Sequence, residues 1–102
     1  MHRFRHAALG AIAAGLCGCA MTQNVAPPVT AAMVAASDGH SAEVLKEGRR
    51  LFAGRCTSCH AADPVASRSV AEWHRIVDDM ADRSKLTAAD RSALLAYISA
   101  AR

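Results

Sequence analysis

The chain has 102 residues, which is enough for one small domain and no more. Apolar residues make up 52% of it but aromatic residues only 4%, so much of the apolar content is alanine and any core must be thin. The formal net charge is only +3 and no basic patch is interleaved with aromatic residues, which argues against nucleic-acid binding.

The first residues have the pattern of an export signal. Arg3 and Arg5 form a basic start, and the apolar run at 7–16 is too short to span a bilayer as a stable helix. The run ends in Leu-Cys-Gly-Cys, which resembles the bacterial lipobox. That resemblance implies a signal peptide over 1–18, cleaved before Cys19, and lipidation of Cys19. The alternative is an ordinary signal peptide with incidental cysteines.

These features predict a protein on the periplasmic side of a bacterial membrane, held there by a lipid anchor or otherwise soluble. Ala20 stands where an aspartate would resemble an inner-membrane retention signal, so an outer-membrane anchor is favoured. Without Arg3 and Arg5 the basic and acidic residues nearly balance, and charge therefore predicts nothing about a partner.

A linker is expected between the anchor and the folded part. Residues 21–40 carry no charge before Asp38, show no clean period and contain the pair Pro27-Pro28. We therefore expect a flexible tether over 19–40 and a folded domain over 41–102.

Three amphipathic helices are predicted within 41–102, and no segment alternates as a strand would. The first covers about 41–53. The second begins at Ser69 and the third at Thr87, each followed three positions later by an acidic residue that completes a capping box. The residues expected to face the core are Val44, Gly48, Leu51 and Phe52, then Trp73, Ile76, Val77 and Met80, then Leu94, Leu95, Tyr97 and Ile98.

A folded unit of this size has a marginal hydrophobic core and usually needs a staple. Cys56 and Cys59 are the only thiols left to supply one. A disulfide across so short a loop would add little stability, and a structural zinc site needs a second ligand pair that is missing. A thioredoxin-like dithiol would follow a strand. A redox-active dithiol protein without haem remains an alternative.

Cys56, Cys59 and His60 form the Cys-x-x-Cys-His sequence that attaches c-type haem. One helical turn brings the two thiols to the two vinyl groups at one edge of the porphyrin, and the histidine that follows can bind the iron. Attachment takes place outside the cytoplasm, which agrees with the export signal. The sequence therefore predicts one covalent haem c, with thioethers to both cysteines and His60 as the proximal iron ligand.

With these residues the chain resembles the class I cytochrome c family, and within it the short single-haem domains, over about 41–102. Gly48 and Phe52 resemble the N-terminal helix of that family, and Tyr97 stands where its C-terminal helix carries an aromatic residue. The resemblance implies an all-α, three-helix domain wrapped around the haem. It also implies that Gly48 lets the C-terminal helix cross closely.

The distal iron ligand is less directly indicated. The segment 73–80 resembles the Trp-x-x-x-Val-x-x-Met segment of short cytochromes in which the methionine binds iron, and this implies Met80 as the distal ligand. The alternatives are His74 as the ligand, or Met80 as a plain core residue. Weaker candidates lie in the expected tether: Met21, Met33 and His40.

Two further roles can be assigned around the haem. The carbonyl of Pro64 could bind the other ring nitrogen of His60 and orient the imidazole. Arg55 and Arg68 could neutralise the haem propionates, although surface solvation is the simpler explanation for both. Because Met80 follows His60 by only 20 positions, the haem should be exposed along one edge.

The sequence thus predicts a periplasmic one-electron carrier that is not itself an enzyme. Its expected partners are a periplasmic dehydrogenase or an oxidase chain, and the membrane through the lipid anchor, with no nucleic acid. One alternative is the electron-accepting haem subunit of a sulfite-dehydrogenase-like complex. A haem protein that binds gases or peroxide is another, and it requires that Met80 leave the iron free.

Overall fold

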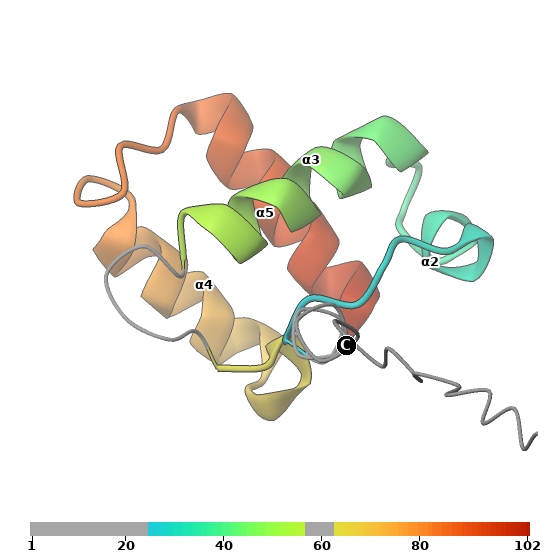
Figure 1. The fold of residues 1–102 in the computed structure, drawn as a ribbon, viewed down its shortest axis with the longest axis horizontal. Coiled ribbons are helices and arrows are strands. Elements are labelled where there is room, and N and C mark those ends of the chain that lie inside the picture. Colours follow the sequence, from blue (N-terminus) through green and yellow to red (C-terminus); the bar gives the residue numbers. More distant parts are fainter. Residues whose placement is uncertain (1–24, 57–62) are drawn as a thin grey trace, which may run out of the picture.

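The computed structural model describes residues 25–56 and 63–102, and within those ranges the protein is built from helices without any strand. The elements in chain order are α2 (Ala31–Ala35), α3 (Ala42–Gly54), the short 3-10 helix η1 (Val65–Ser67), α4 (Val70–Met80) and α5 (Ala88–Ala101). Figure 1 shows α3 crossing α5 at the centre, with α4 beside the pair. The predicted helical fold class is confirmed at this level.

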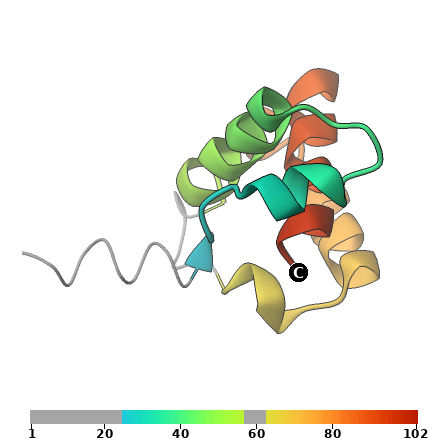
Figure 2. The same ribbon diagram turned by 90° about the vertical axis from the view of Figure 1, so that its right-hand side faces the viewer.

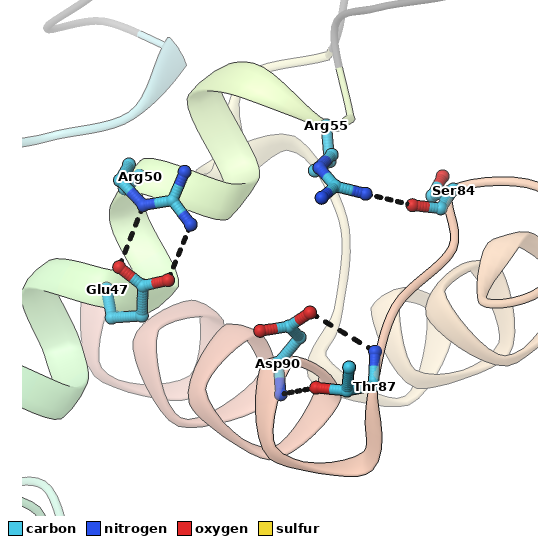
Figure 3. Close-up of polar contacts among 6 residues, drawn as sticks. All are labelled: Glu47, Arg50, Arg55, Ser84, Thr87 and Asp90. Atoms are coloured by element: carbon cyan, nitrogen blue, oxygen red, sulfur yellow. Dashed lines mark hydrogen bonds and ion pairs between the residues drawn. The ribbon is translucent and has the colours of Figure 1, made fainter.

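The three longer helices begin where the sequence predicts because a side chain caps each one. The Ser41 hydroxyl accepts a hydrogen bond of 3.2 Å from a backbone N–H of the first turn of α3. Ser69 with Glu72, and Thr87 with Asp90, form reciprocal capping boxes with distances between 2.8 and 3.1 Å. Figure 3 shows the second of these boxes. Each cap stabilises its helix by about 1 kcal/mol.

Helices α3 and α5 approach so closely that only glycine fits at their crossing. A Cβ atom placed on Gly48 would lie 2.1 Å from the carbonyl oxygen of Ala93 and 2.6 Å from Cβ of Tyr97. These distances are far below van der Waals contact, so the two backbones meet at this point. The close crossing expected from Gly48 is confirmed.

The core lies where these two helices meet α4 and η1. Phe52 packs edge-on against Trp73, with ring centroids 5.3 Å apart, and lies 6.1 Å from the ring of Tyr97. The indole N–H of Trp73 donates a buried hydrogen bond of 2.7 Å to the carbonyl of Val65, which fastens η1 to α4. Leu45 is also fully buried, although the sequence pattern did not single it out. Of the residues predicted to face the core, those only half-buried are Val44, Ile76, Met80 and Leu95.

Residues 25–40, which we call the N-terminal strap, lie against the helical domain. Ala26 is fully buried, the hydroxyl of Tyr97 donates a hydrogen bond of 2.7 Å to the carbonyl of Pro27, and Nε of Arg49 lies 3.0 Å from the carbonyl oxygen of Ala26. The strap includes α2, which is capped by Thr30. This differs from the flexible tether predicted over 19–40, because composition does not reveal that these backbone carbonyls have buried partners.

Several predicted features fall outside the described residues. They are the signal peptide at 1–18, the lipidated Cys19, the first part of the expected tether at 19–24, and Cys59 with His60. Among the helices that are described, none is long and apolar enough to cross a membrane.

Candidate functional site

An apolar cavity of about 240 Å³ lies between α4 and the segments that flank it. Most of the described side chains around it are apolar, and one is a cysteine. The lining residues are Cys56, Asp63, Arg68, Trp73, Ile76, Val77, Met80, Ser84, Leu86 and Leu94. The cavity therefore brings together the start of the Cys-x-x-Cys-His segment and the helix that ends in Met80.

One face of α4 forms a wall of this cavity. Trp73, Ile76, Val77 and Met80 recur at spacings of three and four residues, so their side chains share one side of the helix. Trp73 and Val77 are nearly buried, with 4% and 3% of their surface exposed, whereas Ile76 and Met80 are half-buried. The shared face predicted from the sequence is confirmed, and its half-buried members border the cavity.

Met80 is the last residue of α4, and a tight turn follows it. The backbone N–H of Ser84 donates to the carbonyl of Met80 (2.8 Å), and that of Leu86 donates to the carbonyl of Ala81 (3.0 Å). Lys85 takes the left-handed conformation, with φ of 53°, which this helix-ending turn requires. The turn returns Ser84 and Leu86 to the cavity lining.

Arg55 connects this turn to the end of α3. Its guanidinium donates a hydrogen bond of 2.5 Å to the carbonyl of Ser84, as Figure 3 shows. Arg55 directly precedes Cys56, so the contact joins the chain at the cysteine to the turn that follows Met80. The α3 side and the α4 side of the cavity are thereby held together near its rim.

Cys56 is a half-buried free thiol at the end of α3. Burial raises the pKa of its thiol, because the low-dielectric surroundings disfavour the thiolate. Reactive cysteines of redox proteins and thiolate metal ligands have lowered pKa values instead. The environment of Cys56 therefore keeps the sulfur neutral at pH 7.

The charged residues at the cavity pair with groups of the chain itself. Arg68 and Asp63 form an exposed ion pair of 2.5 Å, and the Arg68 guanidinium lies 5.9 Å from the ring centroid of Trp73. An exposed pair of this kind contributes at most about 1 kcal/mol, so Arg68 can exchange its partner for another anion at little cost. Of the two arginines considered for haem propionates, only Arg68 lines the cavity itself.

The structure separates the described candidates for a distal iron ligand. Met80 lines the cavity, whereas His74 on the same helix is exposed and does not. Met33 is half-buried against the core in the strap, and His40 is exposed. No group of three His, Cys, Asp or Glu side chains suited to a metal ion occurs among the residues that could be searched.

The hydrogen bonds of the Pro64 carbonyl disagree with the role predicted for it, which was to bind the second ring nitrogen of His60. Its carbonyl accepts one bond from the backbone N–H of Ser67 (2.9 Å) and one from the Ser67 hydroxyl (2.7 Å). A carbonyl oxygen has two lone pairs, and both are used here. This carbonyl therefore has no lone pair free for the ring nitrogen of His60, and His60 itself lies outside the described residues.

Sequence reasoning missed part of the cavity wall. It assigned no role to Leu86, Ser84 or Asp63. A signal for Leu86 does exist, since it is an isolated apolar residue between the end of one helix and the cap of the next. No pattern in the sequence marks Ser84 or Asp63.

Comparisons of the chain with models of protein families, with curated proteins and with solved structures gave no match.

Proposed function

We propose that this domain carries one covalently attached c-type haem and transfers single electrons on the periplasmic side of a bacterial membrane. The observation that supports this most is that Cys56 and Met80 line the same apolar cavity. The first is the leading cysteine of a haem-attachment sequence, and the second is the methionine that the family resemblance implies as a ligand.

The cavity has the chemistry that a porphyrin requires. Its described wall includes the apolar side chains of Trp73, Val77 and Leu94, which would exclude water from a bound macrocycle. Its volume of about 240 Å³ lies below the range of about 300–1,000 Å³ typical of small-molecule sites. A porphyrin would therefore part the walls or keep one edge outside them, and an exposed edge is where electrons can cross to a partner.

The chain's own residues have distinct tasks in this proposal. Cys56 and Cys59 would provide the thioethers, and His60 and Met80 would bind the iron. Met80 is preferred to His74 because only Met80 lies at the cavity. Arg68, whose ion pair with Asp63 is exposed and weak, would neutralise a propionate. When bound, the haem supplies the one-electron redox chemistry.

The half-buried position of Cys56 argues against a redox dithiol. A dithiol protein needs a thiolate near neutral pH, whereas burial raises the pKa of this thiol. The periplasmic location and the lipid anchor at Cys19 are part of the same proposal, and the export signal in the sequence supports them.

Spectroscopy of two methionine variants tests the iron ligand. The full-length protein, expressed with a haem-attachment system, should show c-type visible bands and the near-infrared band of methionine bound to ferric haem. Met80→Ala should keep the covalent haem but lose the near-infrared band. Its reduction potential should also fall, on the order of 0.1 V, within the roughly 0.8 V range that axial ligands control.

Met33→Ala is the matched control, because Met33 is also a half-buried methionine packed against the core but does not line the cavity. It should retain the band. A band that survives in Met80→Ala would exclude Met80 as the ligand. A wild-type protein without the band, whose visible spectrum changes in His74→Ala but not in Met80→Ala, would identify His74 instead.

A further inference from the structure

The N-terminal strap is attached to the domain at several independent points. Both Ala26 and Pro27 offer carbonyls to Arg49, at 3.0 and 3.2 Å, and Pro27 also accepts from the Tyr97 hydroxyl. Arg49 and Tyr97 are far from these two carbonyls in the sequence, so the hydrogen bonds hold the backbone of the strap against α3 and α5. Apolar side chains of the strap add to this attachment: Val25, Ala26, Val29 and Met33 lie in or against the core cluster.

The strap fixes the place where the chain enters the domain. The start of the strap, drawn in cyan, lies beside η1 in both Figures 1 and 2. The contacts of Val25 and Ala26 are with the core cluster that also contains Val65 of η1 and Ile98 of α5. The turn between α4 and α5, which follows Met80, lies at the other end of the domain in Figure 1.

This placement shortens the free chain between the expected lipid and the domain. A tether over 19–40 would have about 22 peptide steps and an average span of about 26 Å. With the strap packed, only about six steps separate Cys19 from Val25. Whatever their conformation, these steps cannot exceed about 22 Å.

We propose that the strap holds the domain close above its own membrane, with the η1 end toward the lipid and the turn after Met80 directed away from it. This inference rests on the proposed lipidation of Cys19 and is independent of the haem. The short connection, rather than charge, sets the distance, because the basic and acidic residues nearly balance once the signal is removed. The end of the site that carries Met80 then stays open to a redox partner.

Neutron reflectometry of the lipidated, full-length protein on a supported phosphatidylethanolamine–phosphatidylglycerol bilayer tests the proposal. A domain of this size is about 30 Å across. We expect a gap of at most about 22 Å between headgroups and domain, with the protein layer ending within about 50 Å of the surface. A Gly/Ser insert of about sixteen residues between Ala20 and Met21 should widen the gap, because it raises the maximum span of the connection to about 79 Å.

Each outcome decides the proposal. A gap near 26 Å in the unmodified protein would show that the strap is free and would overturn it. Protein without lipid on Cys19, identified by mass, would overturn it as well, since the connection would then begin elsewhere. The absorption spectrum of the same sample reports on the haem separately. A colourless protein with a short gap would support the strap proposal while rejecting the haem.

Discussion

The crossing of α3 and α5 and the side of α4 that faces the cavity are built in opposite ways. At the crossing, backbone meets backbone at Gly48, and the aromatic ring of Tyr97 is completely buried. Along α4, Ile76 and Met80 are apolar yet only half-buried, because the cavity lies beside them. One region is completed by the chain itself, and the other has apolar surface that no described part of the chain covers.

Under the proposed function, this difference would let so small a domain hold a cofactor. The close packing of α3 against α5 gives a scaffold formed by the chain's own backbone and side chains. A haem in the cavity would bury more of the apolar wall of α4, and burial of apolar area stabilises by about 25 cal/mol per Å². A bound haem would therefore act as part of the core.

The largest expected effect is at the crossing. Gly48→Ala places a Cβ 2.1 Å from the carbonyl oxygen of Ala93, so the helices must move apart. We expect a loss of about 3 kcal/mol or more in the free energy of unfolding, measured by chemical denaturation. Gly54→Ala is the matched control, since a Cβ there meets no atom of another described segment within 4 Å. It should be neutral or stabilise α3 by up to about 1 kcal/mol. Equal effects of the two substitutions would refute the close crossing.

The cavity side should respond to the cofactor more than the crossing does. A Cys56→Ala/Cys59→Ala variant cannot attach haem covalently. In this variant we expect hydrogen exchange of the α4 amides to be at least about tenfold faster than in the haem-loaded protein. The α5 amides near Tyr97 should change less. Uniform acceleration across both helices would show that the two regions do not differ in their dependence on the cofactor.

The strap contact at the crossing should be sensitive to alkaline pH. Burial raises the pKa of Tyr97 to about 12, whereas the unfolded chain releases this proton near pH 10. The unfolded state therefore binds fewer protons between these values, and stability falls as pH rises from about 10 to 12, by at most about 1.4 kcal/mol per pH unit.

Tyr97→Phe removes both the titrating group and the hydrogen bond to Pro27. Below pH 9 the variant should be less stable by about 1 kcal/mol, since Arg49 still donates to the same carbonyl. Denaturation at a series of pH values measures both effects. A variant that keeps the full alkaline decline would assign it to another group.

The smallest effect is expected in the turn after Met80. Lys85 has a φ of 53°, which is unfavourable for a residue with a Cβ, so Lys85→Gly should stabilise the domain by about 0.5–1 kcal/mol. The same substitution at Lys46, an exposed position inside α3, should instead destabilise it by about 1 kcal/mol. Thermal denaturation of both variants measures the two changes in stability. If both substitutions changed the stability in the same direction, the left-handed turn at Lys85 would be contradicted.

The sequence predicted the local features well because their causes are local. Ser69 with Glu72, and Thr87 with Asp90, satisfy the first N–H groups of their own helices, so three residues suffice to locate each start. The spacing of Trp73, Val77 and Met80 likewise determines a shared face. These predictions need no knowledge of the rest of the chain.

The strap and the cavity rim could not be predicted in the same way. Pro27 is held by Tyr97, 70 positions away, and nothing in the composition around it indicates that partner. Leu86 reaches the cavity through a turn in which Lys85 takes an unusual conformation. Arg55 meets the carbonyl of Ser84 only because two helices bring their ends together. Long-range partners of this kind depend on the whole fold.

The intact mass of the mature protein tests the central claim most directly. The protein is made in a host that exports it and attaches haem, and it is denatured in acid and organic solvent before the measurement. The account predicts a species heavier by one haem than the processed chain, and Cys56→Ala/Cys59→Ala should return to the mass without haem. Wild-type protein found only at the mass of the processed chain would contradict the account.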